Sequence, residues 1–171
     1  MHKPLGRVTL LAVTLALTAC GGERPAPPET PRVDMTERER AASQVHVDPA
    51  AAAEMISRYR RDHGLSAVET DPALQKLAQA QANAMAARDQ LSHEVNGTLV
   101  QRLEAAHLSQ LAAVENVSAG YFSLPDVMAG WRRSPPHDAN LLDAPMRRLG
   151  IATAYAPGTR YKVYWALVMG N

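Results

Sequence analysis

The pattern of apolar and polar residues divides this chain into three parts. Residues 8–19 form an uncharged apolar run, and residues 21–47 then carry prolines and charges with few large apolar side chains. From residue 48 to 142 apolar residues recur mainly at helical spacing, whereas from 149 to 168 they alternate or run continuously. Helical spacing indicates amphipathic helices, and alternation indicates strands. The pattern therefore predicts a leader, a tether, and one domain in which helices precede a hairpin.

Helix signals are strongest at two aspartate–proline pairs. Asp48-Pro49 and Asp71-Pro72 each combine a favourable N-cap with a proline at the first helical position. A capping-box pattern that begins at Thr36 adds a short helix within the tether. The predicted helices span residues 36–44, 49–63, 72–88, 98–106 and 124–133.

Strand signals are concentrated near the C-terminus. Residues 149–155 and 161–168 are rich in β-branched and aromatic side chains and are joined by a Pro-Gly turn, which predicts a hairpin. Residues 112–120 have a mixed pattern that we interpret as an extended segment. A chain of 171 residues is long enough for one ordinary domain. Helices followed by a hairpin predict an α+β domain, with a small antiparallel sheet covered by helices.

The first 20 residues have the form of a bacterial export signal. The apolar run follows a positively charged start and is shorter than the roughly 20 residues that a membrane-spanning helix needs. Leu17-Thr18-Ala19-Cys20 resembles the lipobox of bacterial lipoproteins, and Cys20 is the chain's only cysteine. We therefore expect residues 1–19 to be a signal peptide, residues 20–47 a lipidated cysteine with a disordered Pro-rich tether, and residues 48–171 the domain.

These features predict where the protein resides. Lipidation at Cys20 would make the membrane a partner, and the resemblance of Gly21 to the sorting position of Gram-negative lipoproteins favours the outer membrane. Removing Lys3 and Arg7 with the signal peptide leaves 16 basic residues from the original 18, against 17 acidic ones. Such a balance carries no electrostatic signature of nucleic-acid binding.

Three residues outside the core pattern are suited to site chemistry: His93, Glu115 and His137. Imidazole and carboxylate are ligands for zinc or another divalent metal, and two histidines leave coordination positions open. Their spacing carries no metal code, so each could equally be a hydrogen-bonded structural group. A Ser134/His137/Asp138 triad is a weaker hypothesis, because the three lie within one turn and no nucleophile-elbow motif is present.

Four motifs in order resemble those of the CAP superfamily of cysteine-rich secretory, antigen 5 and pathogenesis-related 1 proteins, and its short bacterial members in particular. The resemblance covers residues 49–170. The motifs are Ser92-His93, Val114-Glu115-Asn116-Val117 to Gly120, Trp131 with Ser134, His137, Asn140 and Leu142, and Tyr161 with Tyr164 and Trp165.

The resemblance implies an α-β-α sandwich with a cleft lined by His93 and His137, with Glu115 as its acid. Relatives usually carry a second cleft glutamate where this chain has Ser134, and we expect Ser134 to cap a helix that starts at Pro135. This departure favours binding over catalysis.

The expected function is that of an exported, lipid-anchored binding module of the cell envelope or extracellular space. Its ligand would be an envelope component or a lipid-like molecule, with zinc or another divalent metal as a candidate cofactor in the His/Glu cleft. One alternative is a metal-assisted hydrolase that acts on peptide or cell-wall material through Glu115. Another is a purely structural envelope protein.

Overall fold

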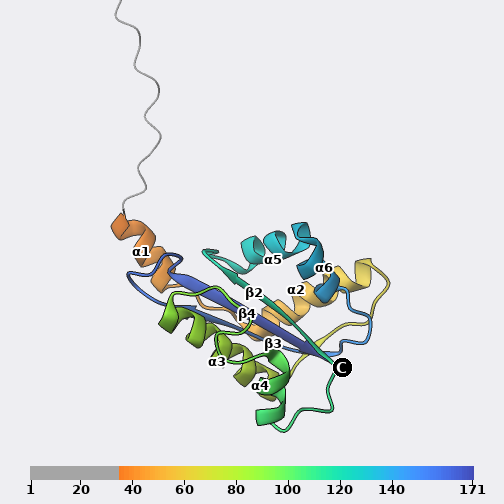
Figure 1. Ribbon diagram of the computed structural model, residues 1–171. Coiled ribbons are helices and arrows are strands. Elements are labelled where there is room, and N and C mark those ends of the chain that lie inside the picture. Colours follow the sequence, from red (N-terminus) through yellow and green to blue (C-terminus); the bar gives the residue numbers. More distant parts are fainter. Residues whose placement is uncertain (1–34) are drawn as a thin grey trace, which may run out of the picture. The chain divides into compact units, whose positions relative to one another are not determined.

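The computed structural model describes residues 35–171, so the predicted signal peptide, Cys20 and residues 21–34 lie outside the described part. The described residues form helices that pack around a central sheet (Figure 1). Its elements are α1 (Met35–Ser43), α2 (Pro49–Asp62), β1 (Glu69–Thr70), α3 (Pro72–Arg88), α4 (Leu99–Ala105), β2 (Ala113–Ala119), α5 (Leu124–Arg133), α6 (Pro135–Leu141), β3 (Arg148–Tyr155) and β4 (Val163–Gly170).

The sheet has the strand order β1-β3-β4-β2. β3 and β4 form the predicted antiparallel hairpin, and β2 pairs antiparallel with β4, which confirms the extended segment. β1 was not predicted and runs parallel to β3. Two residues are too few to show a hydrophobic period, so no sequence pattern could have indicated this strand.

The helices cover both faces of the sheet and create two cores. Figure 1 shows α3 and α4 on one face, with α2, α5 and α6 on the other. Along β4, Trp165 and Leu167 belong to the core under α2 and α5, whereas Ala166 and Val168 belong to the core under α3. This division follows from the alternation of side chains across a strand. The predicted α+β class and α-β-α sandwich are confirmed.

The helices begin where the sequence indicates. The Asp48 side chain accepts a hydrogen bond from the Ala50 amide at 2.9 Å, and Asp71 accepts from Ala73 at 2.7 Å. Each aspartate thus satisfies an amide that has no partner within its own helix. Thr98 caps α4 in a full capping box with Gln101.

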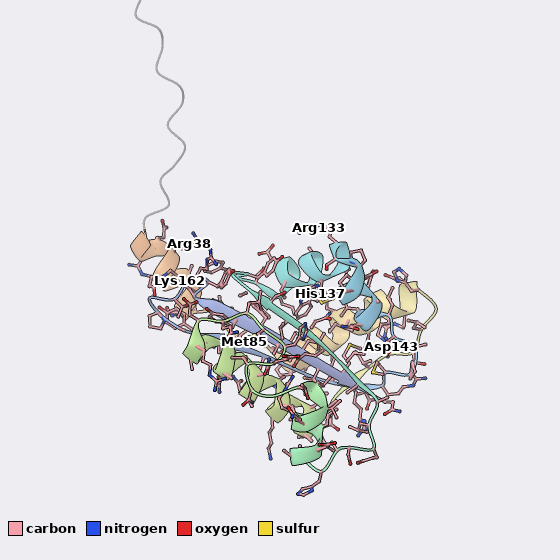
Figure 2. All side chains as sticks on the ribbon, viewed as in Figure 1. Arg38, Met85, Arg133, His137, Asp143 and Lys162 are labelled. Carbon is pink, nitrogen blue, oxygen red and sulfur yellow. The ribbon has the colours of Figure 1, made fainter. Side chains whose placement is uncertain are left out.

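Residues 35–47 belong to the packed domain rather than to the tether. Ala42 and Val47 are buried in the core, and Glu39 on α1 forms an ion pair with Lys162 and accepts a 2.7 Å hydrogen bond from Tyr155. The hydrogen bond from Lys162 lowers the pKa of Glu39 below its ordinary value. Figure 2 shows Lys162 close to the α1 end of the domain. The expected helix at 36–44 is confirmed, but the tether boundary at residue 47 is wrong, because Ala42 and Val47 contribute to the core.

No helix within residues 35–171 is long and apolar enough to cross a membrane.

Candidate functional site

The candidate site is built around β2, the strand at one edge of the sheet. Glu115 and Asn116 are adjacent in β2, so their side chains point to opposite faces. Glu115 meets His93 from the loop between α3 and α4, while the Asn116 side chain donates to the backbone carbonyl of His137 at 3.0 Å. Strand β2 therefore contains Glu115 and contacts the other two residues that the sequence singled out, His93 through its side chain and His137 through its backbone carbonyl. Figure 2 shows His137 on the α6 side of this strand.

His93 is held by a buried acid. Its Nδ1 lies 2.9 Å from Glu115 Oε1, and the His93 side chain is 56% exposed whereas that of Glu115 is 3% exposed. The preceding residue is fixed as well, because Gln81 donates to the Ser92 carbonyl at 2.8 Å. The imidazole is thus anchored at one nitrogen while much of the ring remains accessible to solvent.

Arg102 on α4 forms an ion pair with Glu115 and anchors the loop that contains His93. Its Nη1 donates to Glu115 Oε2 at 2.7 Å, and its Nε and Nη2 donate to the backbone carbonyls of Gly97 and His93. The Arg102 side chain is 5% exposed, so the ion pair with Glu115 is buried. The motifs noted in the sequence do not include Arg102. The available signal was a charge on a core-facing position, which requires a partner.

His137 occupies the first turn of α6. Its Nδ1 lies 2.8 Å from the Ser134 hydroxyl oxygen. Burial lowers the pKa of His137, and the charge of nearby His93 lowers it further. Ser134 stands at the N-cap position as expected, but its side chain makes no capping hydrogen bond because it contacts His137 instead.

The α6 helix is fastened from both sides. The Asn140 side chain donates to the Glu115 carbonyl at 3.0 Å and to Asn116 Oδ1 at 2.8 Å. From α2, the Tyr59 hydroxyl donates to Asp138 Oδ1 at 2.6 Å. Asp138 therefore orients Tyr59 rather than His137, and the proposed Ser134/His137/Asp138 triad lacks its third member.

Arg60 holds the end of α6. Its side chain is fully buried, and its guanidinium donates to the backbone carbonyls of Ser66, Leu141, Asp143 and Met146 at 2.8–3.0 Å. Buried charges are tolerated only when they are hydrogen-bonded. Three of the four carbonyl partners lie more than 80 residues away along the chain, so the sequence could not indicate this role.

The contacts determine what the site can do chemically. Both Nδ1 atoms have protein partners, and no hydrogen bond within residues 35–171 uses the Nε2 of His93 or of His137. Both oxygens of Glu115 are engaged, which leaves this acid poorly placed to act as a base. Two ring nitrogens therefore remain for a ligand.

Comparison with known proteins identifies relatives over most of this domain. A family model described as "CAP: Cysteine-rich secretory protein family" matches residues 53–169. The fold is similar to that of an outer surface protein from Borrelia burgdorferi, with a TM-score of 0.64, 20% identity, and coverage of 74% of this chain and 96% of that one. It is also similar to an extracellular protein containing an SCP domain from Bacillus anthracis, with a TM-score of 0.60, 23% identity, and coverage of 85% and 45%.

One curated relative is similar at the level of sequence. The uncharacterized membrane protein YlbC of Bacillus subtilis is 31% identical over 94 residues, which are 54% of this chain and 27% of that protein. The match thus spans about a quarter of the length of that relative.

Proposed function

Because this chain belongs to the cysteine-rich secretory protein (CAP) family, we propose that it is an exported binding module of the cell envelope. Two proteins with similar folds are described as an outer surface protein and an extracellular protein, and a sequence relative is described as a membrane protein. These descriptions agree with the export signal expected from residues 1–19.

We further propose that Cys20 is acylated and anchors the protein to the outer membrane. Replacing Cys20 with serine removes the thiol that would carry the lipid. We expect Cys20→Ser to abolish incorporation of labelled fatty acid and to move the protein out of the membrane fraction. The measurement is metabolic labelling followed by fractionation, with Ser43→Ala as a control at an exposed position of α1. Unchanged labelling of the Cys20→Ser protein would reject the anchor.

The strongest support for binding comes from the hydrogen-bond partners of Glu115 and of the two imidazoles. Both carboxylate oxygens of Glu115 are used, one by His93 and one by Arg102, so the candidate general base of the site already has two partners. The Nε2 atoms of His93 and His137 have no hydrogen-bond partner within residues 35–171. Such a site presents two imidazole nitrogens to a ligand, and its buried acid is not available as a general base.

Hydrolysis is disfavoured for a second reason. Ser134 could attack a carbonyl only if donors were available to stabilise the oxyanion that forms. The two residues that follow it are Pro135 and Pro136, which have no amide hydrogen. The first two positions of α6 therefore offer no backbone donor to an oxyanion formed at Ser134.

A lipid-like ligand has a second possible contact surface nearby. A hollow between α2 and α5 is lined by three apolar side chains and four polar or charged ones: Met55, Pro125 and Met128, with Arg58, Tyr59, Asp62 and Arg132. Tyr59 is hydrogen-bonded to α6, the helix that carries His137. A ligand with an apolar part and a polar group could contact both regions.

The donor set does not fit a dedicated zinc centre. Such centres use three or four protein ligands, and residues 35–171 contain no group of three His, Cys, Asp or Glu side chains placed to hold a metal ion. A divalent ion would have two imidazole ligands here and would depend on water or the bound molecule for the rest. The proposed binding function does not require it.

Calorimetric titration with zinc chloride tests the metal proposal. We expect weak binding that His93→Ala or His137→Ala reduces at least about tenfold, because each imidazole would supply half of the protein ligands. His46→Ala removes an exposed imidazole away from the site and serves as the control. An absence of heat in the wild type, or equal binding in all variants, would rule out a metal at this site.

The ligand itself can be sought with defined probes. Muropeptides and short-chain phosphatidylglycerol are added separately to protein with labelled histidines, and the imidazole resonances are followed by NMR. We expect one probe to shift His93 and His137 together in a saturable manner. Shifts confined to His46, His63 or His107 would place the binding elsewhere and contradict the proposed site.

A further inference from the structure

We infer that Arg102 is the positioning residue of this site, and that it dictates which nitrogen of His93 faces a ligand. The inference rests on the proposed function, in which the His93 imidazole contacts the bound molecule. The Arg102 side chain is 5% exposed, and its donors are used within the protein. It acts through Glu115 and through the backbone of His93.

The contacts of Glu115 determine which nitrogen of His93 carries the proton. Glu115 Oε2 accepts a 2.7 Å hydrogen bond from the Arg102 guanidinium, which is always charged in proteins. Beside this buried cation the carboxyl group is ionised and can only accept hydrogen bonds. Since Glu115 Oε1 lies 2.9 Å from His93 Nδ1, that nitrogen must be the donor. In the neutral imidazole the lone pair is then on Nε2.

Arg102 also fixes the position of the His93 imidazole. Arg102 also donates from Nη2 to the His93 backbone carbonyl at 3.2 Å and from Nε to the Gly97 carbonyl at 3.1 Å. These contacts close a ring of hydrogen bonds that runs from Arg102 through Glu115 to the His93 side chain, and back through the His93 backbone. His93 is therefore held at its ring Nδ1 by Glu115 and at its backbone carbonyl by Arg102, although more than half of its side chain is exposed.

Arginine is the side chain that can make all of these contacts from position 102. A guanidinium presents several donors in a planar fork and can reach a carboxylate and two carbonyls at once, whereas an ammonium is a point charge. Lysine at this position would preserve the charge beside Glu115 but not the two backbone contacts. Methionine would preserve the aliphatic length and remove both charge and donors. The two replacements therefore separate the charge from the geometry.

The test is the protonation pattern of His93 in long-range proton–nitrogen NMR spectra of the non-acylated Cys20→Ser protein, recorded without ligand at a pH where the imidazoles are neutral. We expect one tautomer in the parent protein, with the proton on Nδ1. Arg102→Met should lose this single tautomer and populate the Nε2–H form, and Arg102→Lys should largely restore the Nδ1–H form. Arg58→Met, which removes an arginine from an exposed pair with Glu54, should resemble the parent.

Two results would overturn the inference. One is a parent protein with the His93 proton on Nε2, which needs no variant to observe. The other is an Arg102→Met protein that is folded and keeps the Nδ1–H form alone. If Arg102→Met does not fold, the parent tautomer and the Arg102→Lys spectrum decide the matter. Because no ligand is present, a failure here is distinct from a failure of the probes to bind.

Discussion

Arg102→Met is expected to lower the free energy of unfolding by about 3–5 kcal/mol, as is typical when one partner of a buried ion pair is removed. Arg102 and Glu115 have side chains that are 5% and 3% exposed, so water cannot replace the lost guanidinium. The variant also leaves the His93 and Gly97 carbonyls without these donors. Urea unfolding followed by circular dichroism measures the loss.

A double-mutant cycle shows whether the effect comes from the unpaired charge. Combining Arg102→Met with Glu115→Gln removes both charges, so the double variant should be more stable than the sum of the two single effects predicts. We expect a coupling energy of at least about 1 kcal/mol, which lies within the range for contacting residues. Arg58→Met should lower the free energy of unfolding by less than about 1 kcal/mol, because the ion pair of Arg58 with Glu54 is exposed. Simple additivity would show that Arg102 and Glu115 do not act as a pair.

Gly150→Ala is also expected to be strongly destabilising, because α3 lies against β3 at this residue. A Cβ on Gly150 would lie 2.2 Å from the Leu74 carbonyl carbon and from the Gln75 amide nitrogen. These are backbone atoms at the start of α3, so relief requires the helix to move away from the sheet. Overpacking in a core costs about 1–3 kcal/mol and occasionally more, and we expect the upper end or beyond.

Gly170→Ala provides a matched control on the neighbouring strand. A Cβ on Gly170 would have as its nearest neighbour a terminal methyl of Leu74, at 3.3 Å, which can rotate away. We expect thermal unfolding to show a much smaller decrease in melting temperature for Gly170→Ala than for Gly150→Ala. Equal decreases would mean that the close helix–sheet contact is not what requires glycine at residue 150.

The helices were predictable from local chemistry, whereas their partners were not. Asp48 and Asp71 indicate where α2 and α3 begin, because an N-cap residue directly precedes its helix in the sequence. Glu39 on α1 bonds to Tyr155, which lies more than 100 residues later, so α1 was predicted as a helix but assigned to the tether. The periodicity of so short a segment cannot show what it packs against.

The site was predictable as a set of residues but not as a network. His93, Glu115 and His137 were identified from ordered motifs, and the structure links all three to β2. The role of Arg102 depends on a contact across 13 residues to Glu115, and the motif itself does not include it. Ser134 was expected to cap α6 by its position, but the side chain turns to His137 because that ring lies one helical turn away.

Incubating the wild-type protein with purified muropeptides tests most directly whether this site binds or hydrolyses. The probes are recovered and analysed by mass spectrometry, with Glu115→Gln treated in parallel. We predict that the muropeptides are recovered intact from both proteins, because Glu115 is held by Arg102 and His93. Cleavage by the wild type that disappears in Glu115→Gln would contradict a binding function and assign the site to a hydrolase.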